Sequence, residues 1–411
     1  KKTNHQNVYF PMLIAESEFN KEKEHIKGFA PEAAMVTTSG VKDFAERLII
    51  RPTSEILFTQ YYAKKIRSHR DLPIKFNQWC SVVRWEKTTR PFLRGKEFLW
   101  QEGHTIHKNK EEAIEETLRM LEIYRKMGEE LLAIPFVVGR KTLKEKFAGA
   151  VDTYSIEALM KDGKALQSGT SHYLGDGFAS AFNIKYADDN NKLLTPFQTS
   201  WGVSTRLIGA VIMAHGDSEG LILPPYVAPY QVALIPIGIS NDDERITTVC
   251  KQLDALNIRY YLDLRDKTMG YKFSDQEMKG IPIRLSLGKN ELANGLVGVC
   301  KRNTGEKFTL KLEELNKIPS LLDTIHQEML ASAKENLIKN THSAKTYDEF
   351  KKLLEQGGYI KMSINEEAED IIKNETGASA RVILDDEKPL TKKCPVTNKA
   401  ISYTVLFAKA Y

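Results

Sequence analysis

Side chains that could bind an anion are concentrated in one stretch, residues 79–107, WCSVVRWEKTTRPFLRGKEFLWQEGHTIH. β-Branched and aromatic residues dominate both ends of this stretch, which predicts two strands joined by a polar loop that contains a Pro and a Gly. Residues two apart on a strand share a face. Arg84 and Glu86 are therefore expected to point the same way on the first strand.

The second strand carries Trp100, Glu102 and His104 on one face by the same alternation. The connecting loop adds three cations, Arg90, Arg94 and Lys96. If the strands pair as a hairpin, one sheet face is highly polar, and the cost of desolvating unpaired charges makes such a face unsuited to core packing. A solvated edge hairpin with salt bridges is one interpretation. The loop cations and the ring systems favour another, a site for an anionic, planar ligand such as a nucleotide.

Three further stretches combine polar side chains with β-type or turn-rich sequence. LIIRPTSE, residues 48–55, would place Arg51, Thr53 and Glu55 on one face if it is a strand, with Pro52 at a strand end or edge. The other two are QSGTSHYLGDG, residues 167–177, and QTSWGVSTR, residues 198–206, which continues into LIGAVIMAHGDSEGLILPP.

At these stretches the sequence resembles the prolyl-tRNA synthetases, which are class II aminoacyl-tRNA synthetases. WCSVVRWE and FLRGKEFLWQEGH resemble motif 2 of that class in its prolyl form. IRPTSE, KFAGA, GTSHYLG, SWGVSTRLIG and HGDSEGLILPP resemble companion segments, NVYFPMLI the tail of motif 1, and VLFAKAY the C-terminus. The motifs are long and ordered, and the resemblance covers essentially the whole chain.

The resemblance implies a proline–tRNA ligase that works in two steps. The carboxylate of proline attacks the α-phosphorus of ATP, which gives prolyl-adenylate and pyrophosphate. The prolyl group then passes to the 3′ hydroxyl of the terminal adenosine of tRNA(Pro). Magnesium is expected to accompany ATP, although the sequence does not indicate its ligands.

Negative charge builds up around the α-phosphate in the first step, and preorganised cations can stabilise it without a covalent intermediate. Arg84 is the catalytic candidate for the α-phosphate, since a guanidinium offers paired donors to phosphate oxygens. Arg206, at the motif 3 position, would hold the far end of a bent triphosphate. Arg94 could assist, and Glu86 would read or position the adenine amino group. The ATP-side set is Arg84, Glu86, Arg94, Gln167, Thr170 and Arg206.

The resemblance also implies a pocket for proline. Thr53 and Glu55 would accept hydrogen bonds from the secondary ammonium, and other residues would form the ring pocket and its support. The proline-side set is Thr53, Glu55, Trp100, Glu102, His104, His172 and Ser204. Gln167, Thr170 and His172 line the same cleft, so each could contact adenosine or proline. Phe29 is expected to line the pocket, although a core aromatic before a turn explains it equally well.

The fold expected from the resemblance is an α+β catalytic domain on an antiparallel sheet, followed by two smaller domains. The catalytic domain is predicted at 1–227, an α/β anticodon-binding domain at 228–332, and a small α+β C-terminal domain at 333–411. In the second, VALIPIGI, IRYYLDL and IPIRLSLG are typical of buried strands, with a helix at 242–256. Its polar loop and helix at 265–280 would face RNA through Arg265, Lys272, Phe273 and Lys279, unless these are ordinary surface charges.

Two departures from the family are visible. In the C-terminal domain, a C-x4-C pair is replaced by Ser363 and Ala368, and a C-x2-C pair by Cys394 and Thr397. One thiol cannot hold a tetrahedral structural zinc, so no structural zinc is expected. About a hundred residues separate the second strand of motif 2 from motif 3, too few for the editing domain of many bacterial members, which indicates the archaeal and eukaryotic-like form. Misactivation of alanine and cysteine is then expected.

Composition sets broad limits on the chain. Its 411 residues carry a net charge of +5 and four scattered cysteines, which argues against a disulfide framework. No membrane span or signal peptide is visible, DNA is not an expected partner, and the family implies a cytoplasmic enzyme. The chain begins at Lys1 and lacks the motif 1 helix, so we interpret it as a fragment of a longer, homodimeric protein.

Two other functions remain open at this point. A catalytically silent synthetase-like protein could bind tRNA or a regulator, although intact Arg84, Glu86 and Arg206 argue against it. A threonyl-type enzyme would grip its substrate through a Cys/His/His zinc site. Only Cys80 with two histidines could imitate that site, in a geometry that the sequence gives no reason to expect.

Overall fold

The computed structural model describes residues 2–21, 28–29 and 33–411. Their contacts form two compact units. The first comprises Lys1–Arg125, Phe136–Ala210 and Asn340–Tyr411, and the second comprises Lys126–Pro135 and Val211–Lys339. The catalytic and C-terminal segments thus share one unit, and the boundary expected between 332 and 333 falls inside helix α10 (Ile318–Lys339). The division into three domains stays a prediction.

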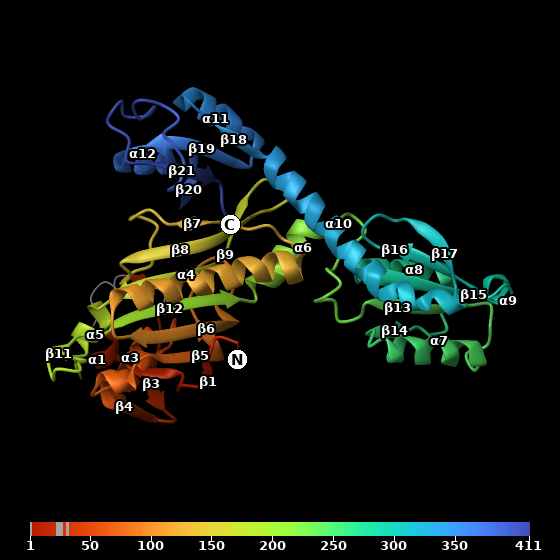
Figure 1. Ribbon diagram of the computed structural model, residues 1–411, viewed down its shortest axis with the longest axis horizontal. Coiled ribbons are helices and arrows are strands. Elements are labelled where there is room, and N and C mark those ends of the chain that lie inside the picture. Colours follow the sequence, from red (N-terminus) through yellow and green to blue (C-terminus); the bar gives the residue numbers. More distant parts are fainter. Residues whose placement is uncertain (1, 22–27, 30–32) are drawn as a thin grey trace. The chain divides into compact units, whose positions relative to one another are not determined.

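An eleven-stranded sheet forms the first unit (Figure 1). In sheet order its strands are β1 (Gln6–Val8), β5 (Ile74–Val83), β6 (Glu97–His107), β12 (Phe197–Ser204), β9 (Ala165–Gly175), β8 (Asp152–Leu159), β7 (Val137–Arg140), β20 (Ser379–Ile383), β21 (Tyr403–Ala408), β19 (Tyr359–Ile364) and β18 (Thr341–Ser343). All neighbours pair antiparallel except β1 with β5 and β18 with β19. The α+β fold on an antiparallel sheet is confirmed.

Helices and two small sheets surround this sheet. They are α1 (Glu16–Phe19), α3 (Glu55–Lys65), α4 (Lys110–Met127), α5 (Gly177–Ala181), α6 (Arg206–His215), α11 (Tyr347–Gln356) and α12 (Glu366–Thr376), the sheet of β2 (Leu13–Ala15), β4 (Lys42–Ile50) and β3 (Ala34–Ser39), and the pair β10 (Tyr186–Ala187) and β11 (Leu193–Leu194). Helix α3 packs on the face that carries His104, since Phe58 stacks on that ring at 4.2 Å. Helix α4 covers the opposite face, where Tyr124 donates to Gln101 at 2.7 Å. The site therefore opens on the α3 face.

The predicted hairpin is present, because β5 and β6 pair antiparallel over ten residue pairs, from Ile74–Ile106 to Val83–Glu97. The expectation that Arg84 and Glu86 lie on its first strand is wrong. Strand β5 ends at Val83, and the Glu86 amide donates to the Arg84 carbonyl at 2.7 Å, which turns the chain out of the ladder.

The stretch LIIRPTSE is also not a continuous strand. Strand β4 ends at Ile50, Pro52 interrupts the ladder, and α3 begins at Glu55. The Arg51 side chain is fully buried and donates to the carbonyls of Phe10 and Ser81, at 2.7 and 3.0 Å. Arg51 therefore links separate segments of the fold. It does not share a strand face with Thr53 and Glu55.

The second unit is an α/β domain of five strands. Its sheet order is β14 (Tyr260–Leu262), β13 (Val232–Ile237), β15 (Ile283–Gly288), β16 (Leu296–Lys301) and β17 (Lys307–Lys311). The first three are parallel and the last two antiparallel. Its helices are α7 (Glu244–Ala255), α8 (Met269–Met278), α9 (Lys289–Ala293) and α10. The three predicted strands and the helix at 242–256 are all found here, around a core of branched apolar side chains.

Candidate active site

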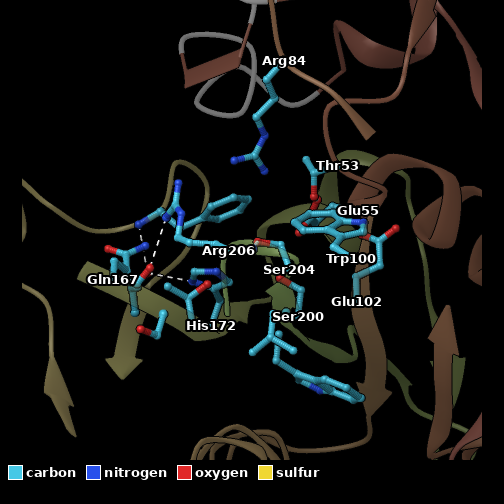
Figure 2. A pocket seen from close by; sticks show the side chains of 18 of the residues that line it. Thr53, Glu55, Arg84, Trp100, Glu102, Gln167, His172, Ser200, Ser204 and Arg206 are labelled. Atoms are coloured by element: carbon cyan, nitrogen blue, oxygen red, sulfur yellow. Dashed lines mark hydrogen bonds between the residues drawn. The ribbon is translucent and has the colours of Figure 1, made fainter. Parts of the chain in front are cut away.

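A pocket with a cavity of about 190 Å³ lies on the α3 face of the large sheet (Figure 2). Strand β12 forms its floor between β6 and β9. Ser200 pairs with His104 on one side and His172 on the other. Two residues along, Gly202 pairs with Glu102 and Thr170. Because Gly202 has no side chain, the floor is open between a carboxylate and a hydroxyl.

Glu102 is a buried carboxylate of the pocket that is held by four hydrogen bonds. Its Oε1 accepts from Ser54 Oγ at 2.5 Å, from Gln78 Nε2 at 2.8 Å and from Cys80 Sγ at 3.3 Å. Its Oε2 lies 2.9 Å from His104 Nε2, which can donate to it. Burial and the nearby Glu102 charge raise the pKa of Cys80 to about 12, so this thiol stays protonated as a donor. Four donors therefore fix one buried carboxylate.

A second buried carboxylate, Glu55, lies at the N-terminus of α3. The helix dipole stabilises a negative charge there. Thr53 Oγ1 donates to Glu55 Oε2 at 2.5 Å. This part of the pocket thus offers buried acceptor atoms, a setting suited to an ammonium group.

The pocket is also lined by cations. The Arg84 guanidinium lies about 5 Å from the rings of Phe29, Phe98 and Trp100, at 5.1, 5.5 and 5.4 Å, and its Nε donates to the Pro52 carbonyl at 3.1 Å. Figure 2 shows Arg84 directed into the cavity from above. Aromatic rings and a carbonyl hold the guanidinium in place.

Arg206 faces the same space from the start of α6. Its Nε donates to the Leu93 carbonyl at 2.9 Å and its Nη1 to the Gln167 carbonyl at 3.1 Å. Burial, and then the positive charges of Arg84 and Arg94, lower its pKa to about 10. Cations held this close are destabilised until an anion joins them, so this part of the pocket favours a phosphate-bearing ligand.

His172 is a neutral wall of the pocket. Burial lowers its pKa to about 4, and the charges of His104 and Arg84 act in the same direction. Its Nδ1 lies 3.0 Å from Thr153 Oγ1 and its ring stacks on Phe147 at 4.4 Å. At neutral pH it can take part in hydrogen bonds but carries no charge.

The structure gathers most of the predicted site residues at this pocket. Those that line it are Phe29, Thr53, Glu55, Arg84, Trp100, Glu102, His104, Gln167, Thr170, His172, Ser204 and Arg206. Glu86 and Arg94 lie outside the lining, although their charges act on Arg206. Arg94 is exposed, and its Nη2 approaches the Tyr411 carbonyl at 3.5 Å.

Sequence reasoning missed Ser200. This side chain is 2% exposed, and its hydroxyl has no hydrogen-bond partner within residues 2–21, 28–29 and 33–411. It points into the cavity from the floor (Figure 2). The alternation Ser200, Gly202, Ser204 along the SWGVS segment was the signal that could have found it.

Comparisons with known proteins agree with this geometry. Residues 37–215 match the family described as "tRNA synthetase class II core domain (G, H, P, S and T)", residues 231–318 "Anticodon binding domain", and residues 347–411 "Prolyl-tRNA synthetase, C-terminal". The chain is 57% identical to "Proline--tRNA ligase" of Aster yellows witches'-broom phytoplasma (strain AYWB) and 51% identical to that of Clostridium novyi (strain NT). Each comparison covers 100% of this chain and 87% of the relative.

The chain belongs to the prolyl-tRNA synthetase family. The resemblance drawn from the motifs is thereby confirmed. Alignments to the two bacterial relatives run over 416 and 420 residues against 411 in this chain. These bacterial synthetases therefore also lack a large insertion within the matched region. No helix in the described part of this synthetase is long and apolar enough to cross a membrane.

In the anticodon-binding unit, three of the residues predicted to contact RNA bind to other groups of the same unit. Arg265 pairs with Asp263 and Asp275 at 2.7 and 2.6 Å, and Lys279 pairs with Asp275 at 2.8 Å. Lys272 is buried and donates to the Asp263 carbonyl at 3.1 Å. These cations hold the loop and α8 together.

The fourth predicted RNA contact, Phe273, belongs to a different cluster. Its ring lies 3.8 Å from the Arg284 guanidinium, and Arg284 Nη1 donates to Glu277 at 2.8 Å. Arg284 Nε, Gln276 Oε1 and Asn303 Oδ1 are buried without a hydrogen-bond partner among the residues described. Arg284 and Gln276 line a cavity of about 410 Å³ with Asn303. Sequence reasoning missed this cluster because its members come from a helix, a strand and a loop.

In the C-terminal segment of the synthetase, Ser363 and Thr397 stand at two of the positions where the family has cysteines. Both side chains make hydrogen bonds within the segment. Ser363 Oγ lies 2.8 Å from Thr404 Oγ1, and Thr397 Oγ1 donates to Asn365 at 2.6 Å. Donors around the Cys394 thiol outweigh its burial and lower its pKa. Across the described residues, no group of three or more His, Cys, Asp or Glu is placed to hold a metal ion.

Proposed function

We propose that this chain activates proline with ATP to prolyl-adenylate and transfers the prolyl group to the 3′ end of tRNA(Pro). The observation that carries the proposal is that one cavity is lined by the carboxylates Glu55 and Glu102 together with the guanidiniums Arg84 and Arg206. An amino acid bound by its ammonium at these carboxylates would direct its own carboxylate towards the cations. A nucleotide phosphate bound by the same cations would then lie next to the carboxylate of the amino acid.

Proline binding is assigned to the part of the pocket that carries Glu55 and Glu102. Thr53 and Glu55 accept from the secondary ammonium, and the ring lies over Gly202 against the Trp100 indole. Glu102 and His104 close the pocket behind the ring. The four donors to Glu102 keep this wall rigid, which supports recognition of a small substrate. His172, Ser200 and Ser204 complete the lining.

ATP binding is assigned to the two guanidiniums. A carboxylate oxygen of proline attacks the α-phosphorus, the bond to the bridging oxygen breaks, and pyrophosphate leaves. Arg84 stabilises the charge that develops on the α-phosphate, and Arg206 holds the β- and γ-phosphates. Gln167 and Thr170 position the nucleotide, while Arg94 and Glu86 act from the motif 2 loop, with Glu86 at the adenine. Positioning and electrostatics supply the rate enhancement, and no covalent enzyme intermediate forms.

Magnesium is the expected companion of ATP. This ion usually keeps several waters and binds through one or two carboxylates together with substrate phosphates. The side chains described include no metal-holding group of three or more His, Cys, Asp or Glu, so the ion is expected to arrive with the nucleotide. When bound, it neutralises phosphate charge. No protein ligand is assigned to it.

Recognition of tRNA(Pro) is assigned to the second unit. With respect to the residues that the structure describes, the cavity at Arg284 offers an unpaired donor, Arg284 Nε, and two unpaired acceptors, Gln276 Oε1 and Asn303 Oδ1. A nucleobase edge presents both acceptors and donors, and the Phe273 ring borders the same cluster. An anticodon base is therefore the ligand that this cavity fits. Arg265, Lys272 and Lys279 support it by holding α8 in place.

A homodimer in the cytoplasm completes the proposal. Trp79 and Leu99 lie on the same face of the β5–β6 hairpin, and they are 67% and 63% exposed. Large apolar side chains exposed side by side are typical of interaction surfaces. A second copy of the chain is the partner that we assign to them. Equilibrium sedimentation of the chain, with Trp79→Ser as the comparison, tests the assignment.

Amino-acid-dependent exchange of pyrophosphate into ATP, run with all twenty amino acids and without tRNA, tests the central proposal. Exchange that is strongest with proline is the expected result, with weaker exchange for alanine and cysteine. Exchange with no amino acid would instead support the alternative of a silent synthetase-like protein that binds tRNA. Binding of tRNA(Pro) would then be measured directly.

A further inference from the structure

A buried ion cluster joins the C-terminal segment to the sheet beside the pocket. Glu157 on β8 is fully buried. It accepts from Lys141 Nζ at 2.8 Å, from Ser155 Oγ at 3.0 Å, and from Arg381 Nε and Nη2 at 3.1 and 2.8 Å. Arg381 lies on β20, 224 residues further along the chain. Burying charges is costly unless they are well paired, so this carboxylate is held in one position.

The carboxylate lies opposite an irregularity in the sheet. Ile156 pairs with Gly169, but Glu157 pairs with Gln167, so Ser168 is one extra residue on β9. Such a β-bulge interrupts the ladder of hydrogen bonds and redirects the bulged strand. The position of Gln167 therefore depends on what holds the strand opposite to it.

Gln167 in turn contacts one of the cations that line the pocket. Its carbonyl accepts from Arg206 Nη1 at 3.1 Å, and Figure 2 shows the two residues side by side in the pocket wall. The Leu93 carbonyl holds the other side of the same guanidinium at 2.9 Å. Two carbonyls thus set the direction of Arg206, and one of them belongs to the bulge.

Electrostatics links the same residues. Burial and two neighbouring arginines lower the pKa of Arg206, and Glu157 is one of the two carboxylates that oppose this effect. Lys141 and Arg381 give the buried cluster two positive charges against one negative charge. If Arg381 becomes neutral, the Lys141–Glu157 pair keeps one positive charge against one negative charge, while the two hydrogen bonds from Arg381 are lost or weakened.

We propose that Arg381 is a positioning residue for the ATP site, which acts through Glu157 on the bulge that holds the Gln167 carbonyl against Arg206. The C-terminal segment would thereby contribute to nucleotide binding without touching the nucleotide. The inference rests on the proposed role of Arg206 at the triphosphate.

The test measures KM for ATP and KM for proline by pyrophosphate exchange, together with thermal unfolding. In Arg381→Gln we expect the KM for ATP to rise about tenfold, since small misplacements of a binding group cost up to about 100-fold, while the KM for proline changes less than twofold. Arg381→Lys keeps the charge but loses the two-point contact, and we expect an intermediate KM for ATP. It also serves as the test variant should Arg381→Gln not fold.

Asp385→Asn is the matched control. Asp385 pairs with Arg140 at 3.0 Å, which also links the C-terminal segment to the large sheet, but the two side chains are partly exposed, and Arg140 pairs in the sheet with Tyr154, three residues before Glu157. We expect both KM values to stay unchanged in this variant. A merely structural role of Arg381 would lower the melting temperature and the active fraction, and would leave the KM for ATP as it is.

The double variant Arg206→Lys with Arg381→Gln separates the possible failures. If both residues act on one contact, its KM for ATP is close to that of Arg206→Lys alone. Additive effects, or an unchanged KM for ATP in folded Arg381→Gln, would overturn the inference while leaving the role of Arg206 intact. An unchanged KM for ATP in Arg206→Lys would overturn the proposed role of Arg206 and the inference with it.

Discussion

Gly202→Ala tests where the proline ring lies. A Cβ at this position would point from the floor of the pocket towards the space between Glu102 and Thr170. It would lie 3.2 Å from the Gln101 carbonyl oxygen and 3.7 Å from the Trp100 ring. The first distance is slightly short, so the strand must move by a few tenths of an ångström. The second is ordinary contact, so the new methyl group stays in the substrate space.

The magnitude follows from the volume of that methyl group. One methylene in a tight apolar pocket changes discrimination by about 1–3 kcal/mol, which is about 10- to 200-fold in rate. We therefore expect kcat/KM for proline to fall about 10- to 200-fold. The KM for ATP should change less than twofold, because we assign the phosphates to Arg84 and Arg206 and not to the floor at Gly202. Alanine is smaller than proline and should lose less, so the preference for proline over alanine should shrink.

Pyrophosphate exchange with proline, alanine and variable ATP measures all three quantities. Gly177→Ala is the matched control, because its Cβ would meet no atom within 4 Å. We expect it to match the unmodified chain in every assay. If Gly202→Ala kept its proline constants and its preference over alanine while melting normally, proline would have to bind elsewhere in the pocket.

Three further predictions follow from the same geometry. Arg84→Ala should slow adenylate formation about 100-fold or more, on the order of 3 kcal/mol, with an unchanged melting temperature, and normal exchange in this variant would remove Arg84 from the mechanism. Arg284→Lys should lower kcat/KM for tRNA(Pro) at least about tenfold, with proline-dependent exchange intact, because lysine has no donor in place of Nε. Burial lowers the pKa of His107 to about 4, so the unfolded chain binds more protons between pH 6.5 and 4 and the free energy of unfolding falls as the pH drops through this range. His107→Gln should reduce that slope by up to about 1.4 kcal/mol per pH unit in urea titrations, and an unchanged slope would show that His107 titrates normally.

Local signals in the sequence were sufficient for much of the fold. Alternating β-branched and aromatic residues located the β5–β6 hairpin, and apolar runs located the three parallel strands of the second unit. The apolar residues that each of these elements buries are close together in the sequence. A short window of sequence is therefore enough to predict the element. The ends of strands were harder to predict. Backbone turns at Arg84 and Pro52, rather than side-chain type, decide where β5 and β4 stop.

For the candidate site, too, the sequence indicated some of the residues and missed others. Residue types and spacing on the hairpin indicated Arg84 and Glu102, and the resemblance to the family indicated Arg206 at the motif 3 position. They did not reveal Ser200, whose buried hydroxyl has no hydrogen-bond partner in the part of the chain that the structure describes. The assignment of Arg265 to RNA stays a prediction, and the structure adds that two nearby carboxylates pair with it.

The sequence by itself determined the family and the class of reaction, and it indicated a set of candidate side chains, most of which line one pocket. Only the tertiary structure decided which of these side chains share a cavity, which are neutral, and which are held by residues far along the chain. The register of β12 between β6 and β9 places Gly202 at the floor of the pocket, and the buried Glu157 pairs with Arg381, 224 residues away in the chain. The physical reason is that burial and pairing depend on strands distant in sequence, and no local pattern records which strands will be neighbours.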